Sequence, residues 1–482
     1  MLGFCHISIY KGGKKVAEKE ISGHFFPLFI IFVLYTTLND TILTDFSNME
    51  NKDNTPKQPK LLDDKTPLVE GAKRLDMSAK PKRVSWWLRP ILWIASIPVT
   101  WIHRTHIKRV NMEGVKRPYL LLCNHNAFYD FMVAIKATFP NQAYYIVAID
   151  GFVGIGGILH WLMARIGCIP KRKFTNDTRL VRQLREVKER RKIVAFYPEA
   201  RYSLCGTNAI LPPSLGKLVK LLKMPVVTLI TQGNHINSPF WHTGDRLIKT
   251  EATMKKILSV EEIEKMDYNQ IMEVINREFY YDDFAWQRDN QIRMTKKTRA
   301  EGLHKVLYQC PHCGKEFRMA SEGAQLWCKE CSHRWWMNEY GELEATEGET
   351  HFSHIPDWYE WERENVRREV EAGTYGTTLR SDVRALPHPK KFVELGEGVL
   401  THDMNGFVLR GEFDGMEYSM TLPAPQRYSI HIEYDYRRWK RDCVDLSTLT
   451  DTMFVFPQGE DFSVTKISLA TEELYKFHNK KE

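Results

Sequence analysis

The chain has 482 residues, enough for two or three domains, and 43% of them are hydrophobic, which excludes a chain without a packed core. Its formal net charge of +8 suits an anionic partner, either a membrane surface or a nucleic acid, and does not choose between them. Four of the nine cysteines form two C-x-x-C pairs, which favours metal ligation in a reducing compartment over a disulfide framework.

Residues 1–80 are predicted to be an apolar segment followed by a polar tail. Lys11, Lys14 and Lys15 precede the apolar stretch 25–38, and this order resembles a signal sequence, but no small-residue cleavage site is evident. The stretch is also shorter than the roughly 20 residues of a spanning helix. The alternative is that translation starts at Met49 and that the segment before it is spurious.

Residues 81–105 are predicted to form a membrane-interfacial helix. The stretch 86–104, WWLRPILWIASIPVTWIHR, is apolar and carries four tryptophans. Tryptophans with flanking arginines are typical of the membrane interface. Two prolines and the short length favour an interfacial or re-entrant helix over a span. The alternative is a buried helix at the start of the next domain.

Residues 106–300 are predicted to form an α/β domain. From 106 to 240, short β-rich runs alternate with helical ones, which indicates βαβ crossovers and a mainly parallel mixed sheet with flanking helices. Sites in such sheets lie at the carboxyl ends of the strands, where His125 and Glu199 fall. Residues 251–300 are highly charged and are predicted to be helical.

Residues 301–345 are predicted to form a zinc ribbon. The two C-x-x-C pairs can close a tetrahedral site with no open position, so the zinc would be structural. Its expected ligands are Cys310, Cys313, Cys328 and Cys331. The alternative is four unrelated thiols. Zinc ribbons often bind nucleic acid, but acidic residues surround this segment and the basic charge is spread thinly, so no nucleic-acid partner is expected.

The last two segments have different patterns. Residues 346–390 are predicted to be a helical linker. Residues 391–482 show short alternating strands with glycine turns and a final helix. This pattern resembles a pleckstrin-homology-like domain or a similar small β-barrel. Such a module can bind lipid headgroups or a protein, or pack against the rest of the chain.

The sequence LLLCNHNAFYDF places His125 at the end of an apolar strand and Asp130 five positions later. At a strand-to-helix junction the two side chains can meet. A carboxylate bonded to one imidazole nitrogen fixes the tautomer and leaves the other nitrogen as a general base. The spacing alone also fits a local hydrogen bond without a catalytic role.

Three further stretches accompany this pair. Arg172 follows a short apolar strand, Glu199 and Arg201 stand in FYPEARYS, and Pro225 leads the apolar strand PVVTL. In this order, the set resembles the glycerolipid acyltransferase family, the 1-acylglycerol-3-phosphate type. The family's first motif, N-H-x-x-x-x-D, is matched by Asn124, His125 and Asp130. The third motif departs from the family pattern, because it has an extra residue before its proline and alanine in place of glycine.

The resemblance implies acyl transfer from a thioester of coenzyme A or of acyl carrier protein to a lysophospholipid hydroxyl. His125 would take the hydroxyl proton and Asp130 would orient the imidazole. The two arginines would hold the acceptor phosphate, with Glu199 positioning the acceptor or bracing them. The implied substrate-binding residues are Asn124, Arg172, Glu199, Arg201 and Pro225.

The resemblance also implies membrane lipids as partners, with the catalytic domain on the cytoplasmic side. Three alternatives remain open at this point. The acceptor can be a different lipid, the chain can be a non-catalytic membrane-associated scaffold that keeps the fold, or the ribbon can serve a nucleic-acid binder.

Overall fold

The computed structural model describes residues 60–62, 66, 69, 72–153, 158–242 and 244–480, together with the backbone of two paired strands near the N-terminus. These strands are β1 (Cys5–Lys11) and β2 (Lys14–Ile21). The apolar stretch 25–38 and the possible start at Met49 lie outside the described residues. In the part of the chain that is described, no helix is long and apolar enough to cross a membrane.

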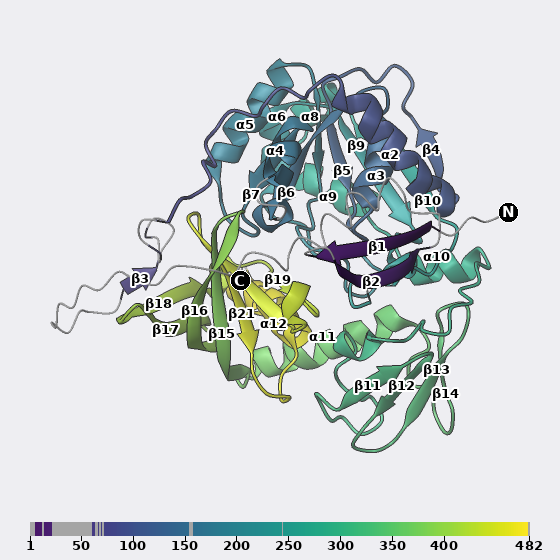
Figure 1. Ribbon diagram of the computed structural model, residues 1–482, viewed down its shortest axis with the longest axis vertical. Coiled ribbons are helices and arrows are strands. Elements are labelled where there is room, and N and C mark those ends of the chain that lie inside the picture. Colours follow the sequence, from purple (N-terminus) through teal and green to yellow (C-terminus); the bar gives the residue numbers. More distant parts are fainter. Residues whose placement is uncertain are drawn as a thin grey trace.

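A seven-stranded sheet with helices on both faces forms the α/β domain at the top of Figure 1. The strands run in the order β4-β10-β9-β5-β8-β6-β7, and only the β9–β10 pair is antiparallel. They are β4 (His106–Val110), β5 (Leu120–Cys123), β6 (Ala143–Ala148), β7 (Cys168–Lys171), β8 (Ile193–Phe196), β9 (Val226–Gln232) and β10 (Glu251–Leu258). The expectation of a mainly parallel mixed sheet is confirmed.

Two apolar layers cover this sheet, one on each face. The central strand β5 contributes to both, and all four of its residues are buried, as expected of a parallel strand covered on both sides. The helices are α2 (Leu88–Ile102), α3 (Asp130–Thr138), α4 (Ile158–Arg165), α5 (Thr178–Glu189), α6 (Leu215–Leu222), α7 (Asn234–Asn237), α8 (Val260–Lys265), α9 (Tyr268–Glu278) and α10 (Asp283–Asp289).

The prediction that residues 251–300 are entirely helical is wrong at its start, where β10 pairs with β9 and β4. The buried residues of β10 include Ala252 and Met254, which alternate with less buried ones, as in a strand with one covered face. Lys255 and Lys256 hide this alternation in the sequence, because long basic side chains can lie at partly exposed positions of a strand next to the edge of the sheet.

The ribbon lies at the lower right of Figure 1 and has four antiparallel strands. They are β11 (Met319–Glu322), β12 (Gln325–Cys328), β13 (Arg334–Met337) and β14 (Leu343–Ala345). Its apolar residues Leu326, Trp335 and Met337 belong to the same core as the C-terminal part of the chain. The ribbon therefore shares a hydrophobic core with the C-terminal part of the chain.

The C-terminal β domain contains one eight-stranded sheet in the order β19-β20-β21-β15-β16-β17-β18-β3. Its strands are β3 (Lys60–Leu62), β15 (Gly376–His388), β16 (Lys391–Asp403), β17 (Gly406–Phe413), β18 (Met416–Pro423), β19 (His431–Glu433), β20 (Cys443–Ser447) and β21 (Thr452–Pro457). Two helices, α11 (Ile355–Glu371) and α12 (Val464–Asn479), pack against each other beside it. Short 3-10 turns are η1 (Ile149–Phe152), η3 (Leu303–Lys305), η4 (Ala424–Gln426) and η5 (Arg437–Trp439).

Two expected boundaries of this β domain are wrong. Strand β15 lies inside the segment 346–390, which was predicted to be a helical linker, and it is a central strand of the sheet. Strand β3 lies inside the predicted polar tail and pairs with β18 in parallel. Strand β15 alternates only weakly between buried and exposed residues, and β3 is three residues long, so the local sequence indicates neither strand. Pairing with distant strands makes both segments extended.

Candidate active site

His125 and Asp130 meet where β5 ends and α3 begins. The distance from His125 Nδ1 to Asp130 Oδ2 is 3.1 Å, and the imidazole side chain is 24% exposed while the carboxylate is 1% exposed. None of the described residues forms a hydrogen bond with His125 Nε2. The carboxylate therefore holds one ring nitrogen and the other nitrogen is available for proton transfer.

Asp130 is itself held by several donors. Its Oδ2 accepts the backbone N–H groups of Asn126 at 2.6 Å and Ala127 at 2.9 Å, and its Oδ1 accepts the Asn234 side-chain amide at 2.7 Å. These donors fix the position and orientation of the carboxylate beside the imidazole. Asn234 is not part of any motif that the sequence shows, although its place just after β9, at the carboxyl edge of the sheet, is a signal of a site residue.

Asp283 holds the loop that contains Asn234 through hydrogen bonds with its backbone. Its Oδ2 accepts the backbone N–H groups of Gly233 at 2.9 Å and His235 at 3.0 Å, which flank Asn234. Burial raises the pKa of Asp283 well above its usual range, although these two N–H groups oppose that effect. No local pattern in the sequence indicates this contact, because Asp283 lies in the charged segment after the sheet.

Asn124 and Pro225, both predicted to bind substrate, have structural contacts. The Asn124 side chain accepts the backbone N–H of Thr231 and donates to its carbonyl, both at 2.8 Å, which joins β5 to β9. The Pro225 carbonyl accepts the N–H of Leu120 at the start of β5. About five extended residues, roughly 16 Å, separate that end of the strand from His125. The structure does not bring Pro225 to the site.

Glu199 lies fully buried beneath His125. Its Oε2 accepts the His125 backbone N–H at 2.8 Å, and its Oε1 accepts the Ala209 N–H at 2.7 Å and the Tyr281 hydroxyl at 2.9 Å. Burial raises the pKa of Glu199 to about 7, against the lowering effect of these donors. Glu199 thus positions the backbone of His125, whereas the resemblance implied that it positions the acceptor or braces the two arginines.

The turn after Glu199 explains one departure from the family pattern. Ala200 has φ of +55°, in the left-handed region that glycine adopts most easily. The chain keeps the conformation with alanine, at a cost typical of a non-glycine residue in this region, about 1 kcal/mol or more. The altered motif therefore preserves the local geometry on which the position of Glu199 depends.

Arg172 and Arg201 both contact the β domain. Arg172 is 2% exposed, and it donates to the Leu386 and Pro387 carbonyls at 3.1 and 3.3 Å and to the Thr452 hydroxyl at 2.9 Å. Arg201 is 4% exposed and pairs with the β domain's helix α12. In this arrangement both guanidinium groups are engaged by protein acceptors, so phosphate binding by these arginines stays a prediction.

Two tyrosines enclose the imidazole. The ring centroids of His125 and Tyr202 are 4.1 Å apart, and those of His125 and Tyr197 are 4.6 Å apart. Tyr197 is the extra residue in the third motif. The resemblance to a known motif did not point to either ring, because that motif has no aromatic residue at these two positions.

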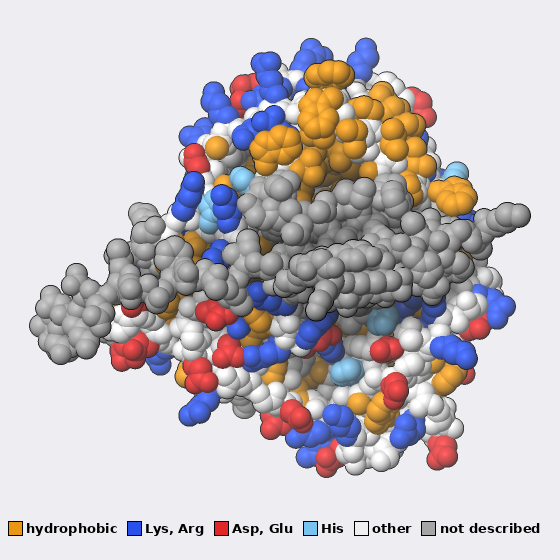
Figure 2. Space-filling model, viewed as in Figure 1, with side chains coloured by type: hydrophobic (Ala, Val, Ile, Leu, Met, Phe, Trp, Pro, Cys, Tyr) orange, Lys and Arg blue, Asp and Glu red, His pale blue; other side chains and the backbone are white. Residues whose placement is uncertain are grey.

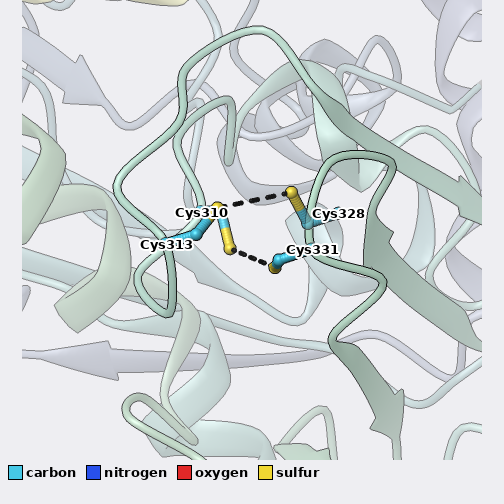
Figure 3. Close-up of side chains that lie close together, drawn as sticks. All are labelled: Cys310, Cys313, Cys328 and Cys331. Atoms are coloured by element: carbon cyan, nitrogen blue, oxygen red, sulfur yellow. Dashed lines mark hydrogen bonds between the residues drawn. The ribbon is translucent and has the colours of Figure 1, made fainter.

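The four ribbon cysteines lie with their sulfur atoms within 4.8 Å of one another (Figure 3). The Sγ–Sγ distances are 3.8 Å for Cys310–Cys331 and 3.8 Å for Cys313–Cys328. A tetrahedral zinc site with Zn–S bonds of about 2.3 Å places its sulfurs about 3.8 Å apart. The donor set and its spacing therefore fit zinc.

The two cysteine turns have the same backbone. The N–H of Gly314 donates to the Cys310 carbonyl at 2.8 Å, and the N–H of Ser332 donates to the Cys328 carbonyl at 3.0 Å. Gly314 and Ser332 both have positive φ, +75° and +62°. Each C-x-x-C pair thus ends in the same left-handed turn, which aims its two sulfurs at a common point.

A second group of metal-capable side chains, His431, Glu433 and Asp445, lies where the β domain meets the α/β domain. Lys173 Nζ is 3.2 Å from Asp445 and 3.6 Å from Glu433, and it is also 3.1 Å from Asp150. Burial raises the pKa of Glu433 and of Asp445 to about 7 each, and Lys173 opposes this. The Lys173 ammonium group supplies the positive charge that a metal ion would otherwise bring to these carboxylates. The group is therefore an ion-pair network between the domains.

Comparisons with known proteins found similarity within the α/β domain. Residues 100–232 match the family model named Acyltransferase. The solved structure of the 1-acyl-sn-glycerophosphate (LPA) acyltransferase PlsC from Thermotoga maritima is similar at 15% sequence identity, over 40% of this chain and 78% of that one, with a TM-score of 0.33. A search of curated proteins found no match. The matched segment contains β5, His125, Asp130 and Glu199, so this part of the chain is similar to the acyltransferase family.

Proposed function

We propose that the protein is an O-acyltransferase that moves a fatty acyl group from a thioester to the hydroxyl of a lysophospholipid. One observation carries the proposal: His125 Nδ1 is fixed by Asp130 at 3.1 Å, and its Nε2 has no partner among the described residues. A non-catalytic scaffold would not need a histidine held in one tautomer beside a partly open face.

The proposed reaction uses this pair of residues. His125 Nε2 takes the proton of the acceptor hydroxyl while that oxygen attacks the thioester carbonyl carbon. The tetrahedral intermediate then collapses, the C–S bond breaks, and the thiolate takes the proton from the imidazolium. Asp130 stabilises the imidazolium between these two steps. The donor is a thioester of coenzyme A or of acyl carrier protein.

The acceptor that the resemblance favours is 1-acylglycerol-3-phosphate. Binding of its phosphate by Arg172 and Arg201 requires their contacts with the β domain to open, because those contacts engage both guanidinium groups. An acceptor without a phosphomonoester requires no such opening. The second candidate is therefore a different lipid hydroxyl, and the engaged arginines are the observation that favours it.

A panel of acceptors separates these two candidates. The full chain in detergent is incubated with acyl-CoA or acyl carrier protein thioesters and with lysolipids that do or do not carry a phosphomonoester, and the lipid products are followed by mass spectrometry. Turnover only on 1-acylglycerol-3-phosphate supports the first candidate. Turnover only on the other acceptors supports the second, and no turnover on any contradicts the proposed function.

We propose in addition that the ribbon holds one structural zinc, supported by the four convergent sulfurs. All four positions of a tetrahedral site are filled by protein, so the metal takes no part in the reaction. The β domain packs against the acyltransferase domain through contacts that include those of Arg172 and Arg201, and a pleckstrin-homology-like lipid site on it stays a prediction.

We propose that helix α2 binds the membrane surface. Trp86 and Trp101 are 78% and 76% exposed, and Ile91 and Ile94 are more than half exposed. Figure 2 shows hydrophobic side chains gathered over the part of the surface where α2 lies, with basic side chains at its border. Large apolar patches are rare on soluble monomers, so this face fits the headgroup layer of a membrane on the cytoplasmic side.

Deleting residues 1–48 is expected to leave the protein bound to membranes, because α2 and its tryptophans remain. Fractionation of cells and sedimentation with anionic vesicles measure this. Replacing Trp86 and Trp101 together with serine should release the truncated protein, while the exposed Trp336 of the ribbon gives a matched control that keeps binding. A truncated protein found wholly in the soluble fraction would show that the early apolar stretch is the anchor.

A further inference from the structure

We infer that Tyr202 and the Arg201–Glu472 ion pair are positioning elements through which the β domain holds the His125 imidazole. The active site is then complete only when the β domain is docked. The inference rests on the proposed function for its activity test, and on the geometry alone for its second test.

The loop 199–203 forms hydrogen bonds with both the backbone N–H and the backbone carbonyl of His125. The Glu199 carboxylate accepts the His125 N–H at 2.8 Å, and the Ser203 N–H donates to the His125 carbonyl at 2.8 Å. Ser203 is itself fixed, because its hydroxyl donates to the Thr207 carbonyl at 2.7 Å and accepts the Gly206 N–H at 2.9 Å. Where this loop lies therefore determines where His125 lies.

The same loop also contacts the imidazole ring. Tyr202 is tilted by 37° to the His125 ring at 4.1 Å, and Tyr197 is tilted by 42° at 4.6 Å. An aromatic face at this distance limits rotation of the ring and attracts the positive charge that the imidazole acquires when it accepts a proton. Tyr202 thus acts on the reaction through the base that it contacts, which defines a positioning residue.

Arg201, the residue before Tyr202, ties the loop to helix α12 of the β domain. Its Nη2 donates to Glu472 at 2.7 Å and its Nη1 donates to the Ser468 hydroxyl at 3.1 Å. Glu472 is fully buried and also accepts from Arg363 at 2.6 Å and Ser429 at 2.8 Å. Burial opposes the charge of Glu472, but the two arginines outweigh it and hold its pKa below the usual range.

A second contact with the β domain runs through aromatic rings. Tyr202 stacks on Phe240 with centroids 5.0 Å apart, and Phe240 in turn contacts Tyr434 at 5.5 Å and His431 at 6.1 Å. Tyr434 and His431 are buried residues at the β19 edge of the β domain. Tyr202 therefore lies between the catalytic imidazole and the β domain, and Arg201 fixes it from the neighbouring position.

The first test measures turnover of the full chain with Tyr202→Leu and Tyr202→Phe. Loss of the aromatic face should lower kcat roughly tenfold with KM for the thioester changed less than about twofold, since the base is displaced while donor binding stays. Phenylalanine should restore most of kcat. Tyr428→Leu is the matched control, because it removes a ring contact with Phe174 at the same domain interface and does not touch His125.

The second test needs no turnover. Carbethoxylation of His125 by diethyl pyrocarbonate, followed by peptide mass spectrometry, reports access to the ring. The rate at His125 should rise several-fold in Tyr202→Leu, and by less in Ser468→Ala, which removes one of the two Arg201 contacts and leaves the buried ion pair intact. Tyr428→Leu should keep the wild-type rate.

Outcomes separate this inference from the proposed function. A wild-type protein without turnover, but with faster modification of His125 in Tyr202→Leu, contradicts the proposed function and supports the positioning. Turnover with wild-type kcat and wild-type modification in Tyr202→Leu overturns the positioning and keeps the function. Equal effects in Tyr428→Leu also overturn it, because the changes would then reflect general loosening of the interface. If Tyr202→Leu does not fold, the rate at which diethyl pyrocarbonate modifies His125 in Ser468→Ala decides alone. A rate above that of the wild type supports the positioning, and the wild-type rate overturns it.

Discussion

His125→Ala should lower acyl transfer by a factor on the order of a hundred or more, the usual contribution of a positioned general base. The fold should survive, because the backbone contacts of His125 with Glu199 and Ser203 do not involve its side chain. Initial rates with the preferred thioester and acceptor measure the loss, and circular dichroism and the melting temperature check the fold. Asp130→Asn should also lose turnover, since an amide is a poorer acceptor for the three donors at Oδ2.

His354→Ala is the control for this experiment. His354 also bonds an aspartate, with Nε2 at 2.9 Å from Asp282, and its side chain is 16% exposed, but it lies outside the site. Its removal should change turnover by no more than a few-fold. Turnover in His125→Ala that equals the wild-type rate would contradict the general-base assignment, whatever the acceptor.

The purified protein should contain about one zinc ion per chain, and Cys328→Ala should lose it and unfold the ribbon. Structural zinc sites contribute on the order of 10 kcal/mol or more to the folding of small domains. The ribbon has short strands, and its buried residues Trp335 and Met337 depend on the cysteine turns staying closed. Elemental analysis measures the metal, and limited proteolysis within 308–345 measures the folding.

The effect should extend beyond the ribbon. Trp335 packs edge-on against Trp358 of α11 at 4.9 Å, so metal loss should also loosen α11. Cys443→Ala is the matched control, since Cys443 is equally buried but lies in β20 and should leave the zinc content unchanged. A protein without zinc whose four ribbon thiols are freely alkylated in the native state would refute the site.

Much of the α/β domain followed from local patterns. Apolar runs such as that of β5 are long enough to be recognised as buried strands. Their alternation with helices indicates a parallel sheet before any contact is known. Strands β10 and β15 were missed because their charged residues conceal the pairing that makes them strands. Pairing partners lie far away in the sequence, so tertiary contacts override local preference there.

The sequence by itself determined the chemistry that neighbouring residues make together: the His125–Asp130 pair, five positions apart at one junction, and the two C-x-x-C turns of the ribbon. Only the tertiary structure decided which groups Arg172 and Arg201 contact. Arg172 bonds a residue 280 positions away and Arg201 one 271 positions away. A guanidinium group bonds whichever acceptors lie within about 3 Å of it, and at such separations the packing of one domain on another, not the pattern along the chain, brings them there.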